Sequence, residues 1–154
     1  MDATQSASPR PFIPIAARLY APFSSWGWAL IRFATGAILI PHGWQKLFAG
    51  GADVLAGKTL TAWGLPAPAL WAYGVGTLEL AGGALLALGL LTRPVALLFV
   101  IELLVINIGV HWGNGWAWGR GGMQYTVFLL AVCLAACVRG GGEHSLDRRI
   151  GKEF

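Results

Sequence analysis

The side chains of this chain best suited to acid–base chemistry lie inside stretches of apolar sequence. Glu79 interrupts the run 71–91 and Glu102 interrupts the run 94–111, and neither run contains another Asp, Glu, Lys or Arg. An ionisable group inside hydrocarbon is costly, so such groups mark functional sites or substrate pathways by default. The chemistry these acids could supply is proton transfer, or hydrogen bonding to a buried ligand. The first question is which groups balance their charge.

Composition gives the class of protein in which those acids lie. The 154 residues are 56% hydrophobic and only 12% charged, with a mean hydropathy of +0.61, whereas soluble domains have about a quarter of charged residues. The chain is therefore predicted to be a membrane protein of one domain. Its net charge of +4 is attributed to cytoplasmic loops rather than to binding of nucleic acid.

The apolar runs predict an all-α, integral membrane four-helix bundle of up-down topology. About 20 apolar residues are needed to cross a bilayer, and the expected spans are 26–48, 71–91, 94–111 and 122–138. The tight "TRP" turn after the second span, with Pro suited to the first turn of a helix, makes the second and third spans an antiparallel hairpin.

The two ends of the chain flank this 26–138 domain. Residues 1–25 are interrupted by Pro14, Arg18 and Pro22, so we expect an interfacial arm rather than a signal peptide. Residues 139–154 form a basic tail. Cys133 and Cys137 are four residues apart in an apolar run, where they are expected to be inert packing residues.

The distribution of cations predicts the orientation. Four spans put both termini on one side, and that side carries more Lys and Arg than the other. The first set is Arg10, Arg18, Arg93, Arg139, Arg148, Arg149 and Lys152; the second is Lys46, Lys58 and Arg120. Cytoplasmic loops carry the excess of cations. We therefore expect both termini in the cytoplasm, with the chain in a bacterial inner membrane.

This topology predicts two polar layers. Arg32 and Glu102 lie about 9 and 13 Å from the cytoplasmic side at about 1.5 Å per residue, and they are expected to form a structural ion pair in an inner layer. The outer layer gathers His42, Gln45, Lys46, Glu79, Asn107, His111, Gln124 and Tyr125. That outer layer is interpreted either as a functional site or as a hydrogen-bonded polar core.

A set of motifs in this order resembles the DoxX family: "PHGWQK", "GLP", "ELAGGALLALGLLTRPVAL", a His that closes the third span, "GG-x-QY" and "SLD". The positions on the family's pattern are Arg32, His42, Gly43, Lys46, Glu79, Gly82, Gly83, Thr92, Arg93, His111, Gly122 and Tyr125. The resemblance implies a small four-helix membrane protein, some members being similar to the membrane subunit of thiosulfate:quinone oxidoreductases. The family often has an acid where this chain has Gln124.

The first functional hypothesis is a membrane subunit that binds a quinone and receives electrons from a partner protein. His42, Lys46 and Glu79 form the expected catalytic set: His42 donates to a carbonyl, and Glu79 relays protons beside Lys46. Aromatic side chains would flank the ring. The expected binding set is His42, Trp44, Glu79, Asn107, His111, Gln124 and Tyr125, together with Trp112. We find no dinucleotide-binding glycine motif and no CxxC, and expect no covalently bound cofactor.

Two alternatives remain open. The chain is either a non-catalytic anchor or assembly subunit whose Trp-rich loops dock a partner, or a metal-binding protein that uses His42, His111 and Glu79. Transport is disfavoured because the four spans show no inverted repeat, and oligomerisation is left open.

Overall fold

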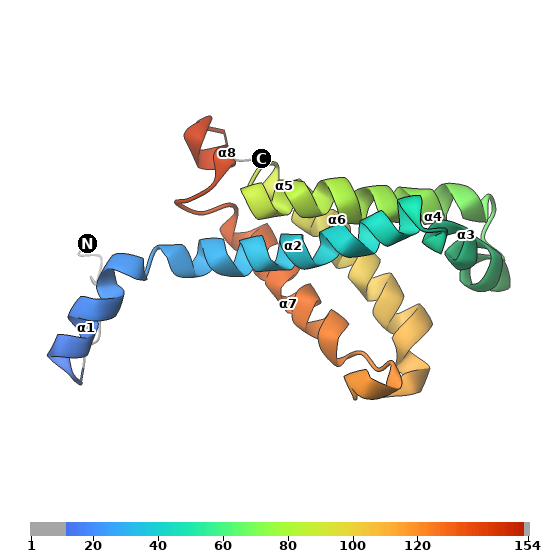
Figure 1. Cartoon of the computed structure of the whole chain (residues 1–154), viewed down its shortest axis with the longest axis horizontal. Helices are drawn as coiled ribbons and strands as arrows, with labels where there is room; N and C mark the ends of the chain where they lie inside the picture. The colour runs from blue at the N-terminus through green and yellow to red at the C-terminus, as the bar shows by residue number, and fades with distance from the viewer. Residues whose placement is uncertain (1–11, 153–154) are drawn as a thin grey trace, which may run out of the picture.

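The computed structural model describes residues 12–152, and every regular element in that part of the chain is helical (Figure 1). The prediction of an all-α fold is therefore confirmed for the described residues. The expected interfacial arm lies partly outside them, in residues 1–11. The α-helices are α1 (Pro14–Tyr20), α2 (Trp26–Phe48), α3 (Gly51–Val54), α4 (Pro68–Thr77), α5 (Gly83–Leu88), α6 (Thr92–Ile106), α7 (Gln124–Arg139) and α8 (Leu146–Arg149).

Three π-helical segments extend or join these helices. One, Leu55–Leu60, continues α3; another, Leu78–Gly82, makes α4 and α5 one continuous rod; the third, Asn107–His111, extends α6. Short 3₁₀ turns complete the chain at Ala21–Phe23, Trp112–Asn114 and Trp118–Arg120. The four long helical stretches begin and end within three residues of the predicted ranges. A π-turn inside an α-helix is rare and frequently occurs at a functional site.

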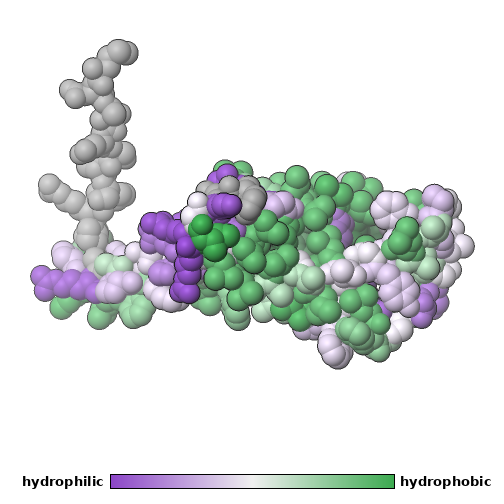
Figure 2. All heavy atoms as spheres, turned by 90° about the horizontal axis from the view of Figure 1, so that it is seen from above, coloured by the Kyte–Doolittle hydropathy of each residue, from purple (hydrophilic) through white to green (hydrophobic). Residues whose placement is uncertain are grey.

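Two of these stretches are long and apolar enough to cross a membrane, judged by length and composition: Pro68–Leu88 and Thr92–Asn114. The helix α2 meets the same criterion only together with Pro14–Phe23, from which it is bent by 50°. The helix α7 is apolar and shorter. Apolar side chains also cover the outside of the molecule across its middle (Figure 2). Together these features indicate an integral membrane protein.

Close packing of α2 along α4 and α5 depends on glycine. A Cβ atom at Gly43 would collide with the backbone of Leu80, and one at Gly36 would collide with the carbonyl oxygen of Gly83. Small residues at such contacts let two helix backbones approach. Figure 1 shows the result: α2 lies beside the α4–α5 rod over most of its length. This contact fixes which residues of the two helices face each other.

The helices α6 and α7 form a second pair, which crosses the pair made by α2 and the α4–α5 rod and leads away from it at an angle (Figure 1). Its buried apolar side chains join those of α5 in one core, in which Phe99, Leu86, Leu129 and Cys133 are almost fully buried. At the other end of α6, the ring of Trp63 leaves no room for a Cβ atom at Gly109. The segment after α3 is thereby held against the π-helical end of α6.

The C-terminal tail packs against the turn between α5 and α6. The two carboxylate oxygens of Asp147 accept hydrogen bonds from the backbone N–H groups of Leu91 (2.8 Å) and Thr92 (2.9 Å). The Asp147 N–H in turn donates to the Gly89 carbonyl (2.9 Å). A carboxylate at a helix N-terminus satisfies N–H groups that have no partner within the helix. The "SLD" motif therefore caps α6.

Candidate functional site

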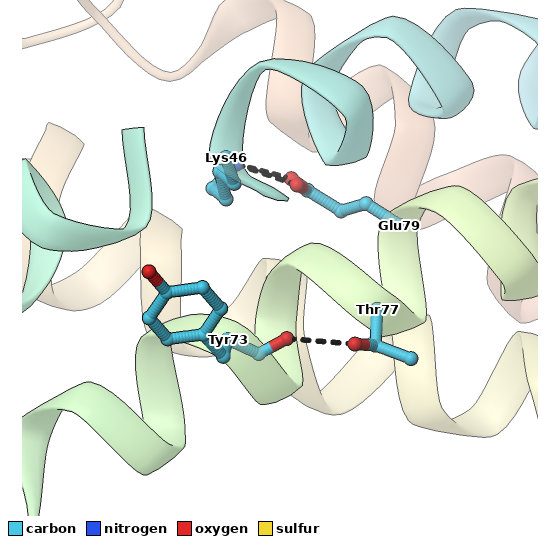
Figure 3. Close-up of polar contacts among 4 residues, drawn as sticks. All are labelled: Lys46, Tyr73, Thr77 and Glu79. Carbon is cyan, nitrogen blue, oxygen red and sulfur yellow. Dashed lines mark hydrogen bonds and ion pairs between the residues drawn. The ribbon is translucent and has the colours of Figure 1, made fainter. Parts of the chain in front are cut away.

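A buried ion pair joins α2 to the α4–α5 rod. Lys46 of α2 donates from Nζ to both carboxylate oxygens of Glu79, at 2.7 Å to Oε1 and 2.5 Å to Oε2 (Figure 3). The Glu79 side chain is 5% exposed and the Lys46 side chain 20% exposed. Burial of two charges is tolerated when they are paired and hydrogen-bonded. The predicted association of Lys46 with Glu79 is therefore present in the structure.

The backbone explains why these two side chains meet. Gly43 rests on the backbone between Gly76 and Leu80, and Lys46 follows Gly43 by three residues, on a neighbouring part of the same helix face. Glu79 lies in the first turn of the π-helical segment Leu78–Gly82. Just before it, Thr77 bonds back to the carbonyl of Tyr73 at 2.9 Å (Figure 3). The acid is thus carried by the irregular turn of an otherwise regular rod.

A second acid belongs to the same cluster. Glu102 of α6 is buried and interacts electrostatically with both Glu79 and Lys46. Among the described residues, no N–H or O–H group donates to either carboxylate oxygen of Glu102, and Glu79 is within hydrogen-bonding reach once one of the two acids carries a proton. One ammonium thus faces two carboxyl groups, and a proton shared between those carboxyl groups would make the set neutral. We call Lys46, Glu79 and Glu102 the Lys–Glu–Glu cluster.

Aromatic groups from α7 and the last loop lie near this cluster. Tyr125 interacts electrostatically with Glu79, and its ring lies 4.8 Å from that of Trp118 and 6.5 Å from that of His42, measured between centroids. His42 is on the outside of α2, one turn before Lys46. The structure therefore brings Tyr125 and His42 to the edge of the cluster.

Other residues of the predicted binding set lie elsewhere and have other partners. Asn107 is buried and accepts a hydrogen bond from Thr126 (2.7 Å), which ties α6 to α7. His111 lies 2.6 Å through Nδ1 from the Gly121 carbonyl and holds the last loop. The remaining three are exposed: Trp44, which packs on Phe48, and Trp112 and Gln124.

The predicted ion pair between Arg32 and Glu102 is not formed, and this part of the prediction is wrong. Arg32 donates instead to the carbonyl oxygens of Leu86 (2.6 Å), Ala87 (2.7 Å) and His144 (2.8 Å). The carbonyls at the C-terminal end of α5 lack partners within that helix, and a cation there is favourable. Glu102 lies deeper along the bundle, beside Glu79.

Sequence reasoning missed Asp147 and the proximity of Glu79 to Glu102. Asp147 interacts electrostatically with Arg32, so the acid near Arg32 comes from the tail and not from the third predicted span. Its signal in the sequence is the "SLD" motif. The sequence signal for the proximity of Glu79 to Glu102 is that both lie at equal distances from the turn between the second and third predicted spans.

The structure does not assemble the alternative metal set of His42, His111 and Glu79. Within residues 12–152, no three His, Cys, Asp or Glu side chains come close enough together to hold a metal ion. Glu79 is engaged with Lys46, while His111 is engaged with the loop carbonyl of Gly121.

Comparison with protein families gives one match. The DoxX family model matches residues 27–112, which is more than half of the 154-residue chain. The matched stretch contains Lys46, Glu79 and Glu102. Neither a curated protein nor a solved structure matches the chain.

Proposed function

Because this chain belongs to the DoxX family, we propose that it is an integral membrane subunit of an oxidoreductase system and binds a quinone at the Lys–Glu–Glu cluster. One observation carries the proposal: among the described residues, no N–H or O–H group donates to the buried carboxylate oxygens of Glu102, and its hydrogen bond with Glu79 needs a proton on one of the two acids. A buried polar group left without a partner costs about 1–3 kcal/mol, more if charged. A ligand that offers a hydroxyl or a proton would remove that cost.

The proposed topology places four spans in the bilayer, formed by α2, the α4–α5 rod, α6 and α7. Large apolar side chains are exposed on the outside of these helices, including Phe33, Ile101 and Phe128. The excess of Lys and Arg at the terminal side supports cytoplasmic termini in a bacterial inner membrane. With this orientation, the Trp-rich loop 112–120 faces the other side.

The donors and acceptors of the cluster suit a quinone. A bound quinone would supply two carbonyl groups that take up two electrons and two protons. Lys46 has three N–H protons, of which two are bonded to Glu79, and the third can donate to a carbonyl. Glu102 can accept a hydroxyl proton or hold one. Tyr125, beside Glu79, offers a further O–H donor.

The proposed division of labour follows from these contacts. Glu102 binds and releases the proton, because no N–H or O–H group of the described chain occupies its oxygens and it can share that proton with Glu79. Glu79 holds Lys46 in place through two hydrogen bonds. His42 lies at the outer edge, next to Tyr125, where it can exchange protons with the aqueous side. Electrons are assigned to a partner protein.

The test is a titration of the purified protein with a short-chain benzoquinone, followed by quenching of its tryptophan fluorescence. We expect saturable quenching in the wild type. Glu102→Gln should weaken binding about 10-fold or more, since removal of a charged hydrogen-bonding partner costs about 1.5–3 kcal/mol. The matched control is Asp53→Asn, the same change of acid to amide at an exposed position.

Equal binding by wild type and Glu102→Gln would contradict the proposal. So would non-saturable quenching that follows only the partition of the quinone into the micelle. If His42→Ala weakened quinone binding and substitutions in the Lys–Glu–Glu cluster did not, the binding site would lie on the outside of α2 instead.

A second candidate function is a non-catalytic anchor that docks a partner. It is favoured by the last loop, in which Trp112, Trp116 and Trp118 are 70%, 60% and 53% exposed. Aromatic side chains are enriched in protein interfaces, although they also suit the membrane interface. Affinity purification in mild detergent would separate the two functions. Loss of a co-purified partner in a Trp112→Ala and Trp116→Ala variant, with quinone binding absent throughout, would favour the anchor.

A further inference from the structure

A cavity of about 800 Å³ lies between the start of α2 and the C-terminal tail, away from the Lys–Glu–Glu cluster. Three cations line it: Arg139 at the end of α7, Arg148 in α8, and Lys152. Two acids, Glu143 and Asp147, also line it. Both carboxylate oxygens of Asp147 accept backbone hydrogen bonds from the α6 N-terminus and Asp147 interacts electrostatically with Arg32, so three cations of the lining face two acids, one of which is already engaged elsewhere. The cavity therefore carries a net positive charge.

The wall of the cavity is held in place by Trp28. Its indole N–H donates to the Gly140 carbonyl (3.0 Å), and the guanidinium of Arg139 lies over its ring, 5.2 Å from the centroid. A guanidinium stacked on an aromatic face keeps its edge N–H groups available to an anion. Arg139 is thus oriented before any ligand arrives.

The position of the cavity indicates where the anion comes from. Trp28 is in the first turn of α2, and tryptophan is enriched at the level of lipid headgroups. The preceding helix α1 exposes Leu19 and Tyr20, as an interfacial helix does. If α2 enters the bilayer as proposed above, the cavity opens among the headgroups. Basic pockets at this depth on the cytoplasmic side bind anionic phospholipids.

We propose that this tail cavity binds the phosphate of an anionic phospholipid headgroup, with Arg139, Arg148 and Lys152 as its ligands. Binding would hold the tail against the α5–α6 turn, because Asp147 lies in the same segment. The proposal needs α2 to enter the membrane, and it does not need the Lys–Glu–Glu cluster to bind a quinone. The two proposals can therefore fail separately.

The test measures thermal unfolding of the full chain in detergent. The midpoint is followed as short-chain phosphatidylglycerol, phosphatidylcholine with the same acyl chains, or inorganic phosphate is added. A ligand bound only by the folded state raises the midpoint, and the rise grows with the logarithm of the ligand concentration divided by its Kd. We expect phosphatidylglycerol to raise it more than either of the other two.

The decisive variant combines Arg148→Gln with Lys152→Gln, both exposed positions whose loss should leave the fold intact. Each cation near a lipid surface contributes about 1 kcal/mol, so about fivefold weaker binding is expected for each and roughly 30-fold for both. The matched control combines Lys58→Gln with Arg120→Gln, which removes the same charge from two exposed positions outside the four long helical stretches. It should keep the wild-type response.

Three results would overturn the proposal. One is an equal response of wild type and the tail variant to phosphatidylglycerol. Another is an equal response to the two lipids, since acyl chains alone would then account for it. The third is an equal response to inorganic phosphate, which would make the cavity a site for a free anion rather than for a lipid.

Discussion

The sharpest prediction concerns Lys46, because the Lys–Glu–Glu cluster has one cation and two acids. Lys46→Met removes the ammonium and leaves Glu79 and Glu102 facing each other. At about 2.6 Å and an effective dielectric constant of about 20, the Lys46–Glu79 attraction is about 6 kcal/mol before desolvation is subtracted. Breaking a buried pair by removing one partner costs about 3–5 kcal/mol. We expect a loss of that size in the free energy of unfolding.

The two acids should respond differently from the lysine and from each other. Glu79→Gln should cost about 1–2 kcal/mol, because Glu102 stays within electrostatic range of Lys46 and can replace the lost partner. Glu102→Gln should change stability by less than about 1 kcal/mol, since no donor to this carboxylate is lost within the described residues and the amide can itself donate to the carboxylate of Glu79. Destabilisation should therefore fall in the order Lys46→Met, Glu79→Gln, Glu102→Gln.

The assay is equilibrium unfolding in mixed micelles, followed by circular dichroism. An ion pair of Glu102 with Arg32 would instead make Glu102→Gln as costly as Lys46→Met, so a loss of about 3 kcal/mol or more in Glu102→Gln would refute the arrangement described here. The double variant Lys46→Met with Glu79→Leu supplies the internal check. It replaces the pair by apolar groups and should recover much of the stability lost in Lys46→Met.

Two further substitutions test the contacts that hold the cluster and the tail. Gly43→Ala should destabilise the protein by about 1–3 kcal/mol, because its Cβ atom collides with the backbone of Leu80, whereas Gly74→Ala, with nothing within 4 Å, should be neutral or stabilising in the same unfolding assay. Asp147→Ala should cost about 2 kcal/mol by leaving the N–H groups of Leu91 and Thr92 uncapped; the loss should appear as faster hydrogen exchange at Thr92, and unchanged exchange there would contradict the capping role.

The helical stretches were predictable because their signal is local. A run of about 20 apolar residues that ends at Gly, Pro or polar residues has few other structures available to it. The bounds of α2, for example, coincide with the predicted range 26–48. The π-helical turn at Glu79 was not predictable, since its extra residue leaves the apolar pattern of 71–91 unchanged. That turn packs against α2, a contact between segments far apart in the sequence.

Which residues of two helices meet depends on how far one helix is shifted along the other. The sequence of a single apolar run does not contain that information. Lys46 and Glu79 are both predicted in the outer half of the bundle, and they do pair. Asn107 and His111 are predicted in the same half, yet they bond to Thr126 and to a loop carbonyl. Depth alone therefore selects the residues of a layer without telling which face of its helix each occupies.

Arg32 and Glu102 lie at different depths once the positions along each helix are counted from the turn between α5 and α6. Glu79 precedes Leu90 by 11 residues and Glu102 follows Leu91 by 11, so an antiparallel hairpin that turns there puts the two acids level, about 16 Å from the turn. Arg32 meets the carbonyl of Ala87, which lies about 12 Å nearer the turn than Glu79 does. Its partners must therefore come from the turn itself.

That geometry follows from the glycine contacts between α2 and α5. Gly36 packs on Gly83, and in antiparallel helices a residue four positions before Gly36 lies opposite a residue four positions after Gly83, which is Ala87. Trp28 and Trp26 come earlier still on α2 and meet the tail and the end of α7. The ring of His144 stacks on Trp26 at 3.9 Å, the Gly140 carbonyl accepts from the indole of Trp28, and the guanidinium of Arg139 lies over the same indole. The basic cavity of the tail is a consequence of the same offset that brings Lys46, Glu79 and Glu102 together.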